Sequence, residues 1–196
     1  MLKKISLVVL CAASAFAMNS ADININDKDL ELGVKFDVGQ FNDDVEPDTM
    51  LVGGRYLHAD KDNSNTNSRY DLDDYYELSF LMQNQMGNED LVLGLGMKLN
   101  YTKNYSTVPL GAEAKYHIPA DTPIPIYINL ALYYAPSVLT MKDADKYLEY
   151  RAEADFEVID NGKITLGYRV MNTDYDDARG DVEYNKSMYI GFKFAF

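Results

Sequence analysis

The sequence predicts an all-β protein: an antiparallel, up-and-down transmembrane β-barrel of ten strands, with an eight-stranded barrel as the alternative. Apolar and polar residues alternate with a period of two from about residue 29 to the end, which is typical of strands with one apolar face. After residue 17, no stretch approaches the roughly 20 consecutive apolar residues of a membrane helix. The chain also ends on an alternating aromatic strand, "YIGFKFAF", whose apolar face needs a protein core or a lipid bilayer to cover it.

Residues 1–17 are predicted to be a cleaved export signal, so that residues 18–196 form a single outer-membrane β-barrel domain. Two lysines precede an apolar run, and Ala15-Phe16-Ala17 fits the small-residue pattern of a cleavage site. A lipoprotein signal at Cys11 is less favoured, because Leu10 stands where a small residue is required. Cleavage would remove Cys11, the only cysteine, so neither disulfides nor thiol chemistry are expected.

The chain is strongly acidic. It carries 18 lysines and arginines against 31 acids, and cleavage would remove two lysines and no acid, so the net charge would fall from −13 to −15. This excess argues against binding to nucleic acid or to a bare anionic lipid surface. It favours partners that bring cations.

Nine strands follow directly from the alternation. In chain order they cover residues 30–39, 52–57, 76–83, 91–101, 110–117, 124–134, 148–158, 164–170 and 189–196. A membrane barrel with both termini in the periplasm needs an even number of strands. The short segment "DININ", Asp22 to Asn26, with a turn at Asp27-Lys28, supplies the tenth strand. In the eight-stranded alternative, the N-terminal segment would lie outside the wall.

The connections alternate in length. Short ones at residues 86–90, 119–123 and 160–162 separate long ones, rich in Asp and Asn, at residues 59–73, 135–145 and 172–185. Short periplasmic turns and long external loops are the layout of outer-membrane barrels.

A soluble barrel with its apolar face inward, or a secreted sandwich, would show similar alternation. The export signal, the terminal strand and tyrosines near strand ends favour a membrane barrel, because such tyrosines form girdles at bilayer interfaces. The tyrosines expected in the girdles are Tyr56, Tyr75, Tyr76, Tyr101, Tyr116, Tyr134 and Tyr168.

The last strand resembles the C-terminal assembly signal of bacterial outer-membrane barrels. Its matching residues are Tyr189, Gly191, Phe194 and Phe196. The resemblance implies that the barrel-assembly machinery recognises this strand and that Phe196 faces lipid near the periplasmic surface.

Five segments are similar to the YfaZ family of outer-membrane proteins. They are "VGGRYLHAD" (52–60), "YELSFLMQNQMG" (76–87), "LGLGMKLNYTK" (93–103), the stretch 133–169 and "YNKSMYIGFKFAF" (184–196), and together they span most of the mature chain. The resemblance implies an integral barrel in the outer membrane of a Gram-negative bacterium. It carries over no catalytic residue.

If the apolar face points outward, the lumen is lined by charged residues. They are eight acids and seven bases: Glu31, Lys35, Asp37, Arg55, Glu77, Lys98, Glu113, Lys115, Glu149, Arg151, Glu153, Asp155, Glu157, Arg169 and Lys193. The centre of this predicted network is Glu149, Arg151, Glu153, Asp155, Glu157 and Arg169. Near-balanced charges in a narrow barrel favour ion pairs that fill the lumen. The alternative is a narrow polar channel, to which the acids of residues 149–157 would give a preference for cations. Gly94 and Gly96 on the inward face would either allow close packing or leave a gap.

An enzyme is the third hypothesis. The only histidines, His58 and His117, are expected at opposite ends of the barrel, and only composition supports a Ser79-Glu77-His58 arrangement. No cofactor, metal site or catalytic residue is predicted. The main prediction is a structural or surface-interaction role with outer-membrane lipid and lipopolysaccharide as partners. Divalent cations at the acidic segments 60–64 and 174–177 are a weaker expectation, because neither segment has the Gly and closing Glu of a calcium loop.

Overall fold

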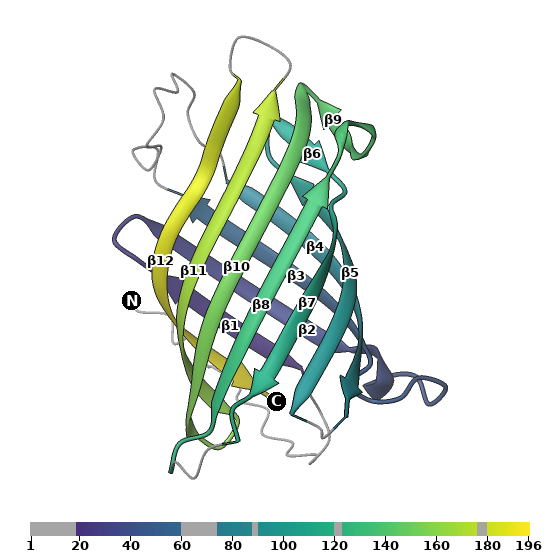
Figure 1. Ribbon diagram of the computed structural model, residues 1–196, viewed down its shortest axis with the longest axis vertical. Coiled ribbons are helices and arrows are strands. Elements are labelled where there is room, and N and C mark those ends of the chain that lie inside the picture. Colours follow the sequence, from purple (N-terminus) through teal and green to yellow (C-terminus); the bar gives the residue numbers. More distant parts are fainter. Residues whose placement is uncertain (1–18, 60–73, 88–89, 120–122, 176–179) are drawn as a thin grey trace, which may run out of the picture.

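The computed structural model describes residues 19–59, 74–87, 90–119, 123–175 and 180–196, and within them the chain forms one closed antiparallel barrel (Figure 1). The ten wall strands are β1 Ser20–Ile25, β2 Asp29–Asp37, β3 Met50–Ala59, β4 Tyr75–Met86, β5 Leu91–Tyr101, β7 Leu110–His117, β8 Ile126–Ala135, β10 Ala144–Ile159, β11 Gly162–Tyr175 and β12 Asp181–Ala195. Consecutive wall strands pair, and β1 pairs with β12 to close the ring. No helix in the described part of the chain is long and apolar enough to span a membrane.

The ten-strand prediction is confirmed, and the eight-stranded alternative is wrong. The "DININ" segment belongs to the wall, because β1 lies between β2 and β12 along its whole length. The turn falls at Asp27-Lys28 as expected. It is held by the side-chain oxygen of Asn26, which accepts the N–H groups of Lys28 and Asp29, each at 2.7 Å. A short polar side chain that bonds its own backbone two residues on is a turn former.

Two short strands were not predicted. β6 (Tyr105–Thr107) pairs with the end of β5, and β9 (Thr140–Lys142) pairs with β6. A three-residue strand is too short for its alternation to be recognised. The pair extends the wall beyond β5 and β7 at one end of the barrel, where β9 follows a short 3-10 turn, η3 (Ser137–Leu139).

The two ends of the barrel differ. The terminal end holds both termini, where Ser20 pairs with Ala195, and the turns after β4, β7 and β10. The opposite, loop end holds the connections after β1, β3, β5, β8 and β11. Loop lengths follow the prediction only in part. The segment 38–49 at the terminal end is long and begins with a 3-10 turn, η1 (Val38–Gln40), while the connection after β1 at the loop end is a tight turn.

The loop predicted over residues 172–185 is mostly strand. β11 continues to Tyr175 and β12 begins at Asp181, so the ladder includes the pair Asp174 and Asp181. Asp and Asn are depleted in strands but do not forbid them where neighbours supply a ladder. The predicted loop 59–73 lies almost wholly outside the described residues.

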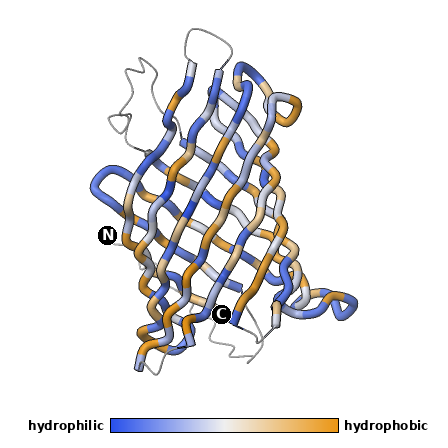
Figure 2. The backbone as a smooth tube through the Cα atoms, viewed as in Figure 1, coloured by the Kyte–Doolittle hydropathy of each residue, from blue (hydrophilic) through white to orange (hydrophobic). Residues whose placement is uncertain are grey.

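Hydrophobic and hydrophilic residues alternate along the wall strands (Figure 2), and their exposure shows that the outer surface is apolar and the interior is polar. Large apolar side chains lie exposed on every wall strand, such as Leu95 with 73% and Met188 with 76% of the side chain exposed. Glu31, Glu149 and Arg169 are instead buried, with at most 1% exposed. This distribution is the reverse of that in a soluble protein, and it is the one that lipid around a barrel requires.

The tyrosine girdle is partly confirmed. Tyr76, Tyr101, Tyr116 and Tyr134 are 42–52% exposed on the outer surface. The girdle prediction is wrong for Tyr75. Neighbouring residues of a strand point to opposite faces, so Tyr75 points into the lumen while Tyr76 points outward, and only 1% of Tyr75 is exposed.

Glycines on the inward face permit close packing against aromatic rings. A Cβ at Gly96 would collide with the Tyr133 hydroxyl, and one at Gly167 would collide with the Tyr189 ring. A Cβ at Gly94 would lie 2.8 Å from Leu81. Of the two readings of Gly94 and Gly96, close packing is therefore the one observed.

Candidate functional site: the layered lumen

The lumen is organised in three layers between the loop end and the terminal end. We call them the tyrosine layer, the ion-pair layer and the vestibule. Each layer takes its inward side chains from several strands that are far apart in sequence.

The tyrosine layer closes the loop end like a protein core. It consists of Leu57, Tyr75, Tyr105, Ala135, Ala144, Tyr147, Met171, Tyr175, Val182 and Tyr184, none more than 8% exposed. Tyr105 packs against Tyr147 with ring centroids 5.9 Å apart and meets Tyr184 edge to face at 6.0 Å. Such aromatic contacts add to the stabilisation from burial. β6 supplies Tyr105, so the unpredicted short strand carries a central residue of this layer.

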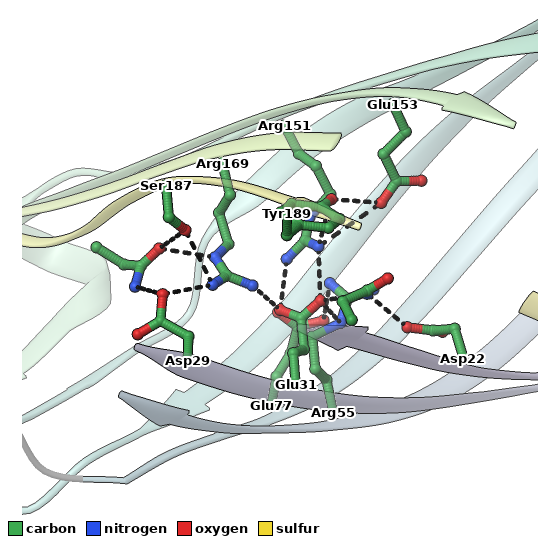
Figure 3. Close-up of polar contacts among 12 residues, drawn as sticks. Asp22, Asp29, Glu31, Arg55, Glu77, Arg151, Glu153, Arg169, Ser187 and Tyr189 are labelled. Atoms are coloured by element: carbon green, nitrogen blue, oxygen red, sulfur yellow. Dashed lines mark hydrogen bonds and ion pairs between the residues drawn. The ribbon is translucent and has the colours of Figure 1, made fainter. Parts of the chain in front are cut away.

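The ion-pair layer lies beneath it and is centred on Glu31 of β2 (Figure 3). Arg151 binds both carboxylate oxygens of Glu31, at 2.8 and 2.9 Å, and Arg169 binds one of them at 2.6 Å. Paired, short contacts of this kind are the strong form of the arginine–carboxylate interaction. Arg169 also reaches Asp29 at 3.4 Å and Asn185 at 3.0 Å. The layer therefore ties β2 to β10 and β11 across the lumen.

Lys98 organises the other side of the ion-pair layer. Its ammonium lies 2.8 Å from both oxygens of Glu149 and 3.1 Å from Glu77, and it sits 4.1 Å from the centre of the Tyr133 ring. All three charged side chains are buried. Buried charges require such pairing, because an unpaired charge in a low-dielectric interior is very costly.

Tyrosine hydroxyl groups join the tyrosine layer to the ion-pair layer. Tyr75 donates to Glu77 at 3.1 Å and Tyr147 donates to Glu149 at 3.2 Å. The same carboxylates that pair with Lys98 thus anchor the tyrosines above them. The tyrosine and ion-pair layers form one continuous packed body.

The vestibule is a cavity of about 180 Å³ at the terminal end. Ser20, Asn161 and Ala195 line its mouth, and Arg55, Lys98 and Arg151 of the ion-pair layer form its floor. Its wall carries Asp22, Lys35, Asp48, Glu113, Lys115, Glu153, Asp155, Lys163 and Lys193. The lumen is therefore hollow at one end and filled at the other.

The predicted network falls into two of these layers. Glu149, Arg151 and Arg169 lie in the ion-pair layer, while Glu153 and Asp155 lie at the vestibule, where Lys193 reaches them at 3.3 and 2.9 Å. Glu157 lies further toward the terminal end and pairs with Lys163 at 3.5 Å.

Several lumen residues were missed. Asp29 and Lys163 lie at strand ends, outside the predicted strand ranges. Tyr75 is predicted for the girdle, and no position is predicted for Tyr105, Tyr147, Tyr175 or Tyr184. The alternation itself could have found them, because strands β2 and β11 begin one residue or more before the predicted ranges.

The residues of the terminal strand lie on both faces of β12. Phe194 and Phe196 are on the outer surface, 39% and 45% exposed. Tyr189 points into the lumen, where its hydroxyl donates to Glu153 at 2.7 Å and accepts from Arg151 at 3.1 Å. A Cβ at Gly191 would collide with the side chain of Asn24 on β1. The recognition of this strand by assembly machinery stays a prediction.

The histidines lie at opposite ends, as expected. His58 is on the outer face at the loop end and forms a 2.7 Å contact with Asp74, which lowers the pKa of that carboxyl. Glu77 and Ser79 face the lumen, so the Ser79-Glu77-His58 arrangement does not form. His117 contacts Asp90 at 3.1 Å near the terminal end.

The acidic segments weighed as cation sites are largely outside the described residues. Residues 60–64 are wholly outside, and of residues 174–177 only Asp174 and Tyr175 are described, as part of β11. Among the residues that the structure describes, no group of three or more His, Cys, Asp or Glu is arranged to hold a metal ion.

The model of one protein family, described as "YfaZ precursor", matches residues 2–196. The chain belongs to the YfaZ family. A solved structure described as "KdgM porin" has a similar fold, with a TM-score of 0.46 and 10% sequence identity, over 91% of this chain and 98% of that chain. No curated protein matches the sequence. The YfaZ resemblance found in the sequence is confirmed.

Proposed function

We propose that this YfaZ protein is a closed structural barrel of the Gram-negative outer membrane that presents its loop end to the cell surface. The observation that carries the proposal is the filled lumen. Glu31, Glu149 and Arg169 are at most 1% exposed and the tyrosines above them at most 8%. The contacts of Glu31 extend from β2 across to β10 and β11. Side chains packed to this degree leave no water path comparable to that of a porin.

The outward apolar surface supports lipid as the first partner, and the acidic chain supports lipopolysaccharide with its bridging cations as the second. With the termini in the periplasm, the terminal end faces the periplasm and the loop end faces outward. The barrel-assembly machinery is the proposed partner of β12 during insertion.

The test is conductance of the purified, folded protein in planar bilayers. We expect no conductance steps from the wild type. A double variant, Tyr105→Ala with Tyr147→Ala, should thin the tyrosine layer, and Tyr76→Ala on the outer face is its matched control. Frequent steps from the wild type would overturn the proposal, provided that flotation with lipid vesicles shows the same amount of inserted protein for each variant.

A narrow channel is the second candidate, and the vestibule favours it because a cavity of about 180 Å³ already lies in the lumen at the terminal end. The cation preference predicted from residues 149–157 loses its basis. Lys98 pairs with Glu149, Lys193 with Glu153 and Asp155, and Lys163 with Glu157, so these four acids are already matched by bases. We expect any steps from an opened variant to show no preference for cations, measured as the reversal potential in a salt gradient.

A further inference from the structure

The vestibule contains a lysine that the ion-pair network does not use. Lys115 of β7 lines the cavity, and among the described residues it makes no hydrogen bond and no ion pair within 4.0 Å. Its one recorded contact is with the Tyr127 ring, whose centre lies 5.3 Å from its ammonium.

Two further lysines lie close to this position. The Lys163 ammonium is 3.7 Å from the centre of the same Tyr127 ring, so the Lys115 and Lys163 ammonium groups are at most 9.0 Å apart, the sum of the two distances. Lys163 is also directly opposite Lys193 in the β11–β12 ladder. Like charges in directly opposed positions destabilise a sheet. Lys115 and Lys163 therefore share one ring at the edge of the cavity, and Lys193 neighbours Lys163 in the ladder.

Most carboxylates of the vestibule accept from other donors, whereas Asp48 lies on the same wall and attracts Lys115 electrostatically from beyond ion-pair distance. Asp155 accepts from Lys193 at 2.9 Å, from Thr165 at 2.6 Å and from Asn129 at 2.9 Å. Glu113 accepts from Lys35 at 3.2 Å and from Tyr133 at 2.7 Å. Neither acid is within ion-pair distance of Lys115. Lys115 thus faces the cavity without a hydrogen bond or an ion pair of its own among the described residues.

We propose that the vestibule is a binding site for a small oxyanion, a carboxylate or phosphate compound that enters from the terminal end. Lys115 is its main ligand, and Lys163 and Tyr127 form its side wall. A cavity of about 180 Å³ holds on the order of a dozen water-sized atoms, so the ligand is a single small organic anion rather than a polymer. An oxyanion would supply Lys115 with the charge-assisted hydrogen bonds that the protein does not. The site goes beyond the proposed structural role, because it needs no passage through the lumen.

The experiment uses the full folded barrel in a neutral detergent. Inorganic phosphate and succinate are titrated separately by calorimetry, and protection of lysines from acetylation is read by mass spectrometry at each concentration. We expect saturable binding of at least one anion, with protection of Lys115 and not of Lys186, which is exposed near the loop end. Binding of phosphate alone or of succinate alone would identify the oxyanion class.

The decisive variant is Lys115→Gln, with Lys186→Gln as the control that removes the same charge from the loop end. We expect Lys115→Gln to weaken binding about tenfold or more and to keep the heat-dependent gel mobility of a folded barrel. Without anion, this variant should be at least as stable as the wild type, because it removes a charge that makes no hydrogen bond or ion pair among the described residues.

Three results would overturn the site. The first is the absence of saturable binding of either anion to the wild type. The second is that Lys115→Gln binds the anion as tightly as the wild type does. The third is that Lys115→Gln is less stable than the wild type while its anion binding is unchanged. The last result would make Lys115 a structural residue. None of them bears on conductance, so the proposed closed barrel would stand or fall separately.

Discussion

The two halves of the lumen are built from the same strands but solve the problem of a polar interior in different ways. At the loop end and in the middle, the inward side chains are long or aromatic and pack until almost nothing is exposed. At the terminal end, lysines and acids surround a cavity and remain partly open to solvent, as in the Lys35–Glu113 pair with side chains 30% and 24% exposed. The comparison teaches that alternation of polar and apolar residues specifies a barrel wall, whereas the size and pairing of inward residues decide whether the barrel is filled.

The largest contrast should come from breaking one ion pair in each half. Arg169→Ala removes one of the arginines bound to Glu31 and the arginine beside Asp29, and both acids stay buried. We expect a loss of about 3–5 kcal/mol in the free energy of unfolding. Lys35→Ala in the vestibule should cost about 1 kcal/mol or less, because water can solvate Glu113. The measurement is urea unfolding of the inserted barrel, followed by gel mobility. Equal losses would mean that the two halves are equally hydrated.

A second contrast uses one substitution at two inward positions of β3. Leu57 in the tyrosine layer is fully buried, while Leu51, six residues earlier, is 8% exposed and lines the vestibule. We expect Leu57→Ala to cost about 2–5 kcal/mol through the cavity it leaves, and Leu51→Ala to cost roughly 1 kcal/mol less because it borders an existing cavity. The same urea titration checks both values. A larger cost at Leu51 would contradict the layered description.

Tyr189 tests how the halves are joined and whether its predicted assembly role depends on its hydroxyl. Tyr189→Phe removes the hydrogen bonds with Glu153 and Arg151 but keeps the ring over Gly167. We expect a loss of about 1.5–3 kcal/mol in stability, since both partners are charged, with normal amounts of folded protein in the outer membrane. Deletion of Phe196 should have the opposite profile, with less folded protein in the membrane fraction on gels of unboiled samples. Poor insertion of Tyr189→Phe would assign the hydroxyl to assembly.

The smallest effects concern pH at the two ends, and they have opposite signs. Burial raises the pKa of Asp48 near the vestibule by more than the nearby Lys115 lowers it, and Asp37 adds a smaller increase. At the loop end, the hydrogen bond with His58 lowers the pKa of Asp74. Because its folded-state pKa is raised, the charged form of Asp48 destabilises the fold at pH values above that pKa. Asp74 has a depressed folded-state pKa, so its contribution is present above its unfolded pKa and is lost as the pH falls through the folded one.

These signs are tested with two amide variants. At pH 7, Asp48→Asn should be slightly more stable than the wild type, and Asn tolerates the positive φ of 66° at this position. Asp74→Asn should be slightly less stable at pH 7. Both differences should shrink as the pH is lowered toward 3 in unfolding titrations. Differences that do not change with pH would assign the effects to packing rather than to charge.

Much of the fold could be predicted because successive side chains of a strand point to opposite faces, which gives the sequence a period of two. Nine of the ten strands, the outward apolar surface and the inward position of Glu149, Arg151 and Arg169 follow from that period. Tyr75 and the strand residues after Asn172 show where the prediction failed. At Tyr75, two adjacent tyrosines point in opposite directions. After Asn172, the residues are polar and predict a loop, but they pair with β12 as a strand.

The sequence by itself determined the barrel class, nine of the ten wall strands and the family, because these depend on local periodicity and on recognisable segments. Only the tertiary structure decided that Arg169 meets Glu31, 138 residues away along the chain, and that Tyr105 of an unpredicted strand closes the loop end. The stagger between strands sets which inward side chains share a layer, and it arises from all ten pairings together. For the same reason, the absence of an ion-pair partner at Lys115 among the described residues could not be read from the sequence.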